Sequence, residues 1–225
     1  MTREPVDFEL SAKYGCADAE YSLHKQPRSL SRKLSAWREV QVARKALMYA
    51  GEPGLVLDLP CGAGRFWPML SEKTNRQIIA ADNSVELLAV ACKSHPAAVA
   101  RRVKPMVTSA FSIELPDGSV DSIFNMRLLQ YIPEAADRAR LLKEFHRVTR
   151  DTVVLSLWVD GNYNAWKNAR DARRGAVDGR HYQLRLVIPT KTIEAEFKVA
   201  GFTIQEHLDL LPMYAMRRIY ILRKG

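Results

Sequence analysis

Apolar side chains recur at intervals of three and four residues over the end of the first fifty residues. This spacing places them on one face of a helix. Basic residues, among them Arg38 and Lys45, fall on the opposite face, and Gly51 and Pro53 end the pattern. The sequence therefore predicts an amphipathic helix whose apolar face packs on the rest of the protein. The residues of that face are Leu30, Leu34, Trp37, Val40, Ala43 and Leu47.

From residue 51 onward, short apolar runs alternate with segments of helical spacing. Runs of this length that are apolar throughout are typical of buried strands, and their alternation with helices predicts βαβ units in a parallel sheet covered on both faces. Ser84 is a candidate N-cap for the second helix. The predicted strands are 55–59, 77–81, 104–107, 120–125 and 152–159, and the predicted helices are 65–71, 85–93 and a segment around 141–148.

The C-terminal tail has a different pattern, because the apolar runs 203–209 and 218–222 have no helical segment between them. Two such strands are expected to pair antiparallel at one edge of the sheet. The predicted fold is therefore α/β and Rossmann-like. It has a seven-stranded, mostly parallel sheet with an antiparallel C-terminal edge hairpin, helices on both faces and an N-terminal helical cap.

Composition agrees with a globular chain and excludes several classes. The 225 residues are 47% hydrophobic and 26% charged, with 11 Gly and 11 Pro, which excludes disordered and fibrous proteins. The length suits one domain. The formal charge of 34 − 25 = +9 favours anionic partners, namely phosphates, nucleic acid, an acidic glycolipid or a membrane surface. A basic surface with no polyanion partner is the alternative.

The cysteines favour a reducing compartment. Cys16, Cys61 and Cys92 are odd in number and contain no CxxC pair, so we expect no disulfide framework and no metal site. The first ten residues lack the apolar run of a signal peptide, and no stretch reaches the ~20 apolar residues of a spanning helix. We expect a cytoplasmic protein, and peripheral contact with a membrane stays open.

A glycine-containing turn after the first predicted strand is the strongest candidate for a ligand loop. Gly62 and Gly64 lie between a strand and a helix, where glycine lets the backbone approach a ligand and the helix offers free N–H groups. Trp67 stands where a dinucleotide fingerprint has its third glycine, and no Gly-Lys-Ser/Thr follows. Two acids accompany the turn: Asp58 ends the first strand, and Asp82 ends the second, where it could accept both hydroxyls of a ribose.

Four segments in this order resemble the class I S-adenosylmethionine-dependent methyltransferases. They are VLDLPCGAGRF, IIAADNS, LPDGSVDSIF and LLQYIPEAADRARLLKEFHRVTRDTVVLSLW. The resemblance runs from about Leu55 to Val159 and continues through the tail. It implies one methyltransferase domain over 1–225, divided into an N-terminal helical cap (1–50), a cofactor-binding core (51–160), a basic lid insertion (161–191) and C-terminal strands (192–225). The implied cofactor is S-adenosyl-L-methionine, and the implied product is S-adenosyl-L-homocysteine.

The resemblance also implies roles for particular residues. The turn would hold the methionine part of the cofactor, and the acid of the second strand would hold its ribose. Residues after the second and third strands would border the adenine, and the end of the fourth strand would lie beside the sulfonium and the acceptor. The residues of the methionine part are Asp58, Pro60, Cys61, Gly62 and Gly64, and the ribose residue is Asp82. The adenine residues are Asn83, Ser109 and Ala110, and those at the sulfonium are Asn125 and Met126.

Four positions depart from the family pattern. Pro60 replaces a usual glycine or alanine, and Ser109 replaces a common aspartate, so the adenine amino group would need another partner. Gln130 and Tyr131 stand where the family often has two histidines, which puts a histidine acid–base role there in doubt. His181 and Tyr182, in the insertion, are weak candidates for a catalytic role. A solvated loop histidine is the simpler interpretation.

The acceptor is predicted from charge and from the family's use of the insertion and the N-terminal segment as a lid. Basic residues with interleaved aromatics could grip a phosphate and stack on a ring. The expected lid residues are Arg38, Trp166, Arg173, Arg174 and His181. Solvated helix faces are the alternative interpretation. Arg38 or Arg44 could instead bind the cofactor carboxylate.

These observations favour a methyltransferase with an anionic or phosphate-bearing acceptor. The acceptor could be a small metabolite, a phosphorylated envelope glycolipid or RNA. The segment DLPCGAGRFWPML resembles bacterial methyltransferases of lipopolysaccharide synthesis, which favours the glycolipid as acceptor. RNA is less favoured because no separate RNA-binding module is present. The alternatives from other classes are a nicotinamide-dependent oxidoreductase and a degenerate methyltransferase fold that acts as a regulatory binding protein.

Overall fold

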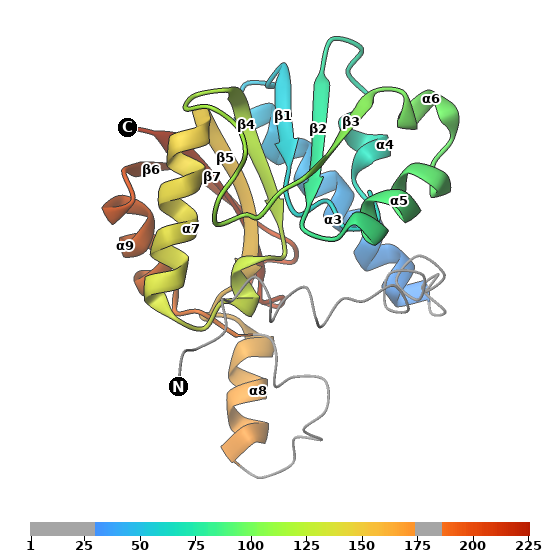
Figure 1. Cartoon of the computed structure of the whole chain (residues 1–225). Helices are drawn as coiled ribbons and strands as arrows, with labels where there is room; N and C mark the ends of the chain where they lie inside the picture. The colour runs from blue at the N-terminus through green and yellow to red at the C-terminus, as the bar shows by residue number, and fades with distance from the viewer. Residues whose placement is uncertain (1–29, 174–185) are drawn as a thin grey trace, which may run out of the picture.

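A seven-stranded sheet forms the centre of the molecule (Figure 1). The computed structural model describes residues 30–173 and 186–225. Along the sheet the strands follow the order β3-β2-β1-β4-β5-β7-β6. Their bounds are β1 (Leu55–Asp58), β2 (Gln77–Asp82), β3 (Val103–Val107), β4 (Val120–Met126), β5 (Thr149–Trp158), β6 (Phe202–Asp209) and β7 (Arg217–Lys224).

The first five strands of the sheet are parallel, and the C-terminal pair is antiparallel. β1 pairs with β2 and β4, whereas β7 runs antiparallel between β5 and β6. The predicted fold class is therefore confirmed. The chain order reverses between β1 and β4, and in open α/β sheets such a switch point is where ligands bind, outside the carboxyl ends of the strands.

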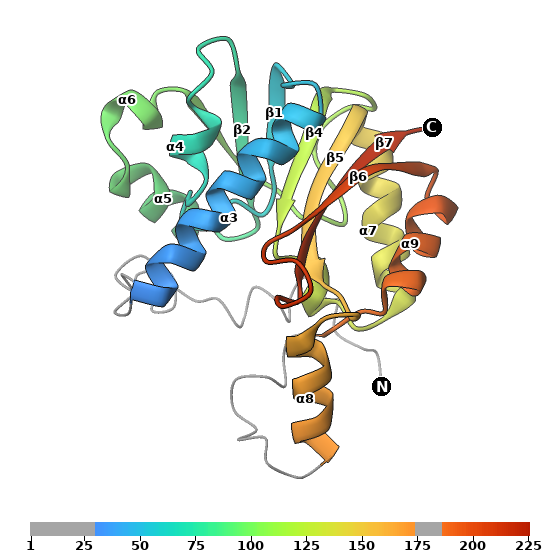
Figure 2. The ribbon, with the colours of Figure 1, turned by 180° about the vertical axis from the view of Figure 1, so that it is seen from behind.

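Helices cover both faces of the sheet (Figures 1 and 2). One buried cluster joins the sheet to α3, α4 and α5, and a second joins it to α7 and α9. Because side chains of a strand alternate between faces, Ile123 belongs to the second cluster and its neighbour Phe124 to the first. The helices are α3 (Leu30–Tyr49), α4 (Trp67–Leu70), α5 (Val85–Ser94), α6 (Ala97–Ala100), the 3₁₀ turn η1 (Leu129–Tyr131), α7 (Ala135–Val148), α8 (Tyr163–Arg173) and α9 (Thr190–Val199).

The N-terminal helix forms as predicted, but its predicted apolar face is buried only at one end. Leu30, Leu34 and Trp37 are 85%, 63% and 56% exposed, whereas Ala43 and Leu47 are buried. The second half of α3 packs on the sheet, whereas its first half extends past the carboxyl edge of the sheet (Figure 2). Helical periodicity identifies a face but does not say how much of it meets a partner.

Two helices in the C-terminal part were not predicted. α8 has no buried residue, so it lacks the apolar stripe that marks a helix in sequence. α9 buries Ile193 and Phe197 against the core and crosses the predicted boundary at residue 191. Figure 1 shows α8 projecting beyond the carboxyl edge of the sheet. Among the described residues, no helix is long and apolar enough to cross a membrane.

Candidate cofactor site and the neighbouring arginine cluster

The loop after β1 is tied to the ends of both neighbouring strands. The Leu59 N–H donates to the Phe124 carbonyl of β4 (3.0 Å), and the Cys61 N–H donates to the Ala81 carbonyl of β2 (2.9 Å). Pro60 lies between them after a cis peptide bond. These bonds continue the sheet for one step beyond β1, so the loop has a fixed position at the carboxyl edge.

Asp82 connects this loop to the end of β2. One carboxylate oxygen accepts from the Gly62 N–H (2.9 Å) and the other from the Ser84 N–H (3.1 Å). Ser84 caps α5 by accepting from the Leu87 N–H, as predicted. Burial raises the pKa of the Asp82 carboxyl above its ordinary value. The loop and the acid thus form one rigid unit, and the remaining lone pairs of the carboxylate can accept further hydrogen bonds.

Asp58 lies beneath the same loop and is almost fully buried. Burial raises its pKa well above the ordinary value, and the nearby charge of Asp82 raises it further, while the Trp67 indole acts in the opposite direction. Burial, followed by the charge of Asp58, also raises the pKa of the Cys61 thiol, which excludes a reactive thiolate. A cationic group placed above these two carboxyls would favour their ionised forms.

The surroundings of the two glycines in the loop differ. Gly64 has φ of +72°, and a side chain there would come within 2.7 Å of Trp67 and 2.8 Å of His95. Packing therefore demands Gly64. Gly62 has φ of +53°, yet a Cβ there would meet no atom within 4 Å. The backbone at Gly62 borders open space beside the Asp82 carboxylate, which fits the closest approach of an adenosine-type cofactor.

The predicted adenine-side residues lie beyond the ends of β2 and β3. The Thr108 N–H donates to the Asp82 carbonyl (3.1 Å), so the next two residues follow directly after a contact with the end of β2. Ser109 accepts from the Phe111 N–H through its hydroxyl (3.0 Å), and Ala110 is buried. Asn83 is exposed at the same edge. The structure brings these predicted residues together around one edge of the Asp82 unit.

At the end of β4, the predicted residues are buried structural elements. Asn125 is fully buried and donates to the Leu59 carbonyl (2.6 Å), and Met126 is 5% exposed. Gln130 in η1 is also fully buried, and no hydrogen bond to either polar atom of its side chain is found among the described residues. Buried polar atoms of this kind are uncommon and mark a place where a ligand or water could bind.

Four side chains next to this position form an ion-pair cluster, here called the Glu39 cluster: Glu39, Arg65, Arg127 and Arg217. Glu39 of α3 is 1% exposed and pairs with Arg65 (2.6 Å), Arg217 (2.9 Å) and both Nε and Nη2 of Arg127. Burial alone would raise the pKa of Glu39, but Arg127, Arg217 and Arg65 lower it to about 2. The cluster carries three positive charges and one negative charge, a net +2.

Sequence reasoning missed this cluster. Arg65 follows the glycine turn, and Arg127 follows β4 with φ of +68°, so both could have been flagged as charges at the carboxyl ends of predicted strands. Glu39 had no such signal, because it lies on the buried side of a helix whose apolar face was read from other residues. Arg217 lies opposite Trp158 in the pairing of β7 with β5.

The predicted lid residues divide into described and undescribed positions. Arg38 is exposed and donates to the Leu210 carbonyl (3.2 Å), and Arg173 ends α8 exposed. Trp166 is 57% exposed. Arg174, His181 and Tyr182 lie outside the described residues, so their predicted roles stay predictions.

An open groove of about 700 Å³ runs along α8. It is lined mainly by apolar atoms, including Tyr163, Trp166 and Met213. Tyr163 stacks on Tyr214 with ring centroids 5.7 Å apart, and Arg170 lies over the Trp166 ring at 5.0 Å. This surface belongs to the part of the chain predicted as a lid. Among the described residues, no group of three or more metal-ligating side chains is present.

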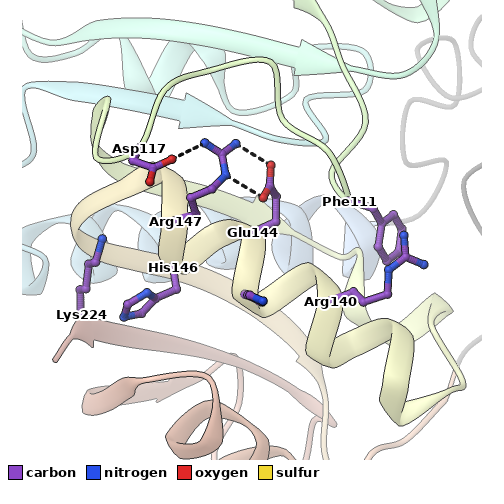
Figure 3. Close-up of a pocket in the computed structure, with 8 residues that line it drawn as sticks. Phe111, Asp117, Arg140, Glu144, His146, Arg147 and Lys224 are labelled. Carbon is purple, nitrogen blue, oxygen red and sulfur yellow. Dashed lines mark hydrogen bonds and ion pairs between the residues drawn. The ribbon is translucent and has the colours of Figure 1, made fainter.

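A second pocket lies on the outer side of α7 and contains none of the predicted cofactor residues (Figure 3). Arg147 lines this pocket and pairs with Glu144 (2.7 Å) and Asp117 (2.8 Å). The same guanidinium donates to the carbonyls of Ile113 and Leu115. Its bonds therefore hold the 113–117 segment against α7, which is a structural role.

Comparisons with known proteins agree with this site. Residues 56–152 match the family model described as a methyltransferase domain. No curated protein matches the chain. The matched segment contains the glycine loop, Asp82 and the end of β4, and it supports the predicted methyltransferase class for this part of the chain.

Several solved structures share the fold at low sequence identity. Magnesium protoporphyrin IX methyltransferase (ChlM) from Synechocystis PCC 6803, with bound SAH, has a TM-score of 0.75 and 14% identity, covering 97% of this chain and 99% of that chain. The [4+2]-cyclase SpnF has a TM-score of 0.64 and 15% identity, covering 83% and 80%. A SAM-dependent methyltransferase from Methanosarcina mazei has a TM-score of 0.59 and 18% identity, covering 76% and 92%.

Proposed function

We propose that this chain is a class I methyltransferase that uses S-adenosyl-L-methionine as methyl donor. The observation that carries the proposal is the Asp82 unit, in which one carboxylate fixes the Gly62 backbone and stands at the carboxyl end of β2. The methyltransferase domain match and the similarity to structures solved with SAH and SAM support it.

In this proposal the chain binds the cofactor along the β3-β2-β1 part of the edge. Asp82 accepts the ribose hydroxyls, the Gly62 backbone borders the methionine part, and Asn83, Ser109 and Ala110 border the adenine. When bound, the cofactor supplies an activated methyl group on a sulfonium. Asp58 and Asp82 beneath the loop favour the positive charge of that sulfonium.

The protein's own contribution to the reaction is to hold the acceptor and exclude water. Methyl transfer needs the acceptor atom about 3 Å from the methyl group and in line with the bond that breaks. The end of β4, with Asn125 and Met126, borders this position, and η1 and α8 continue beside it. His181 and Tyr182 stay the proposed proton acceptors for an acceptor that must be deprotonated.

We propose that the acceptor carries an anionic group. The net +2 charge of the Glu39 cluster beside the end of β4 supports this. The aromatic groove along α8 would contact an apolar or ring-containing part of the same molecule. A phosphorylated envelope glycolipid such as lipopolysaccharide core has both features. A small phosphorylated metabolite and RNA are the alternatives.

A second candidate function is a chemistry other than methyl transfer on the same fold. The similarity to the [4+2]-cyclase SpnF favours this alternative, because it shows the fold in a protein that carries the name of a different reaction. The substitutions at Ser109 and Gln130 also allow a binding protein without catalysis.

Titration calorimetry with SAM, SAH and NADH tests the proposal. We expect micromolar binding of SAM and SAH and no binding of NADH. Binding of NADH alone would favour the oxidoreductase alternative, and binding of neither sulfur compound would overturn the proposal. Screening with methyl-labelled SAM then separates the acceptors, because methylation of RNA should fall steeply with added salt.

A further inference from the structure

The Glu39 cluster is built from four elements that converge on the carboxyl edge of the sheet. Glu39 comes from α3, Arg65 from the loop after β1, Arg127 from the residue after β4, and Arg217 from the start of β7. Convergence of separate elements on one carboxylate produces a preorganised set of guanidinium groups at the topological switch point.

The three guanidiniums are held close together despite their mutual repulsion. Burial lowers the pKa of Arg65, and the positive charge of Arg127 lowers it further. Glu39 offsets part of this repulsion, since it accepts from all three arginines. An additional anion beside Arg65 and Arg127 would reduce the repulsion between them, and guanidinium groups are suited to paired hydrogen bonds with carboxylate or phosphate oxygens.

Two of the arginines can reach a ligand. The side chains of Arg65 and Arg127 are 36% and 34% exposed, whereas that of Glu39 is 1% exposed. The Glu39 carboxylate is thus the buried part of the cluster, and part of each of the two arginine side chains is exposed. Each guanidinium has five N–H donors, and Glu39 accepts from one N–H-bearing nitrogen of Arg65 and two of Arg127.

The position of the cluster favours the acceptor over the cofactor. Most of the predicted cofactor residues follow β3, β2 and β1, and Asn125 and Met126 end β4 beside the expected sulfonium. Arg65 lies on the loop after β1, whereas Arg127 and Arg217 lie on the β4-β5-β7 side of the switch point. Arg127 directly follows Met126, at the place where the methyl group and the acceptor are expected to meet. We propose that Arg65 and Arg127, positioned by Glu39 together with Arg217, bind a carboxylate or phosphate group of the acceptor. This assignment rests on the proposed methyltransferase function.

Inorganic phosphate is the probe for this site, measured by calorimetry at constant ionic strength with and without saturating SAH. We expect phosphate to bind in both conditions. Arg65→Gln and Arg127→Gln should each weaken phosphate binding by at least about tenfold, as expected for the loss of one charge-assisted hydrogen bond. Arg150→Gln is the control, because Arg150 is exposed and pairs with Asp121 where β5 begins, at the other edge of the sheet. It should leave phosphate binding unchanged.

Circular dichroism and thermal melting show whether each variant is folded. Absence of phosphate binding in the wild-type protein, or unchanged affinity in both folded variants, would overturn the proposal. Phosphate binding that saturating SAH abolishes would overturn it in favour of the cofactor's own carboxylate as the ligand. SAH binding by the wild-type protein is measured separately, so its absence counts against the proposed function while the phosphate result still judges the anion site.

Discussion

The two halves of the carboxyl edge have opposite electrostatic character. On the β1-β2 side, Asp58 and Asp82 are buried carboxyls whose pKa values are raised, chiefly by burial. On the β4-β7 side, Glu39 is equally buried, yet three arginines lower its pKa to about 2. Burial raises the pKa of a carboxyl in both halves, and on the β4-β7 side the neighbouring positive charges outweigh it. The first half suits a cationic cofactor and the second an anionic acceptor.

The largest expected effect comes from removing the carboxylate of the Glu39 cluster. Glu39→Gln leaves three guanidiniums at one place without their shared anion, so we expect the free energy of unfolding to fall by about 3 kcal/mol. Urea denaturation measures this loss. Glu72→Gln is the control, because Glu72 pairs with Arg44 at an exposed site. It should cost less than about 1 kcal/mol. Equal losses in the two variants would show that the cluster is no more than a surface ion pair.

The pH dependence of stability should differ in sign between the two halves. The folded pKa of Glu39 is about 2 against an ordinary 4.5, so its contribution is present above pH 4.5 and is lost as the pH falls toward 2. The loss amounts to about 3 kcal/mol, from the shift in pKa. Asp58 and Asp82 have raised pKa values, so they bind protons more tightly in the folded state and stability falls as the pH rises through their window.

Urea denaturation from pH 2 to 8 separates the two contributions. In the Glu39→Gln variant the loss below pH 4.5 should become smaller. In an Asp58→Asn variant the loss on raising the pH should become smaller, while the acid side is unchanged. Parallel pH profiles for wild-type protein and both variants would contradict the electrostatic contrast between the halves.

On the cofactor side, Asp82→Ala should weaken SAH binding by about a hundredfold, because two hydrogen bonds to a charged acceptor are lost. The loop would also lose the bond that fixes Gly62. Calorimetry measures the affinity, and circular dichroism verifies the fold. Asp117→Ala is the matched control: Asp117 is 82% exposed and pairs with Arg147 away from the site, so SAH binding should be unchanged. Full affinity in Asp82→Ala would remove the ribose role.

Prediction from sequence succeeded where local pattern and topology agree. The mostly parallel sheet and the antiparallel tail were predicted from the alternation of apolar runs and helical segments, and Gly62 and Asp82 were placed at the ends of predicted strands. It failed where tertiary placement decides. The exposure of Leu30 and Trp37 depends on how far α3 extends past the sheet, and the spacing of apolar residues does not reveal that distance. The Glu39 cluster likewise joins residues up to 178 positions apart.

The fully buried Gln130 illustrates both outcomes. The sequence identified it as a departure from a histidine, which removed an expected acid–base group. The structure adds that its amide is fully buried without a partner among the described residues, a state that the sequence could not show. Local motif comparison reports which group is present, whereas burial and hydrogen bonding depend on the whole fold.

The smallest effect is expected at Arg44, which separates two interpretations of helix α3. The sequence allowed Arg44 to bind the cofactor carboxylate, but its guanidinium is held by Glu72 at 2.5 Å and 2.7 Å and by Gln41. Arg44→Gln should therefore leave SAH affinity unchanged within about twofold and cost less than about 1 kcal/mol of stability. Calorimetry and urea denaturation of this variant, beside Glu39→Gln, measure both. A large loss of SAH affinity would extend the cofactor site onto α3 and would remove the division of the edge into a cofactor half and an acceptor half.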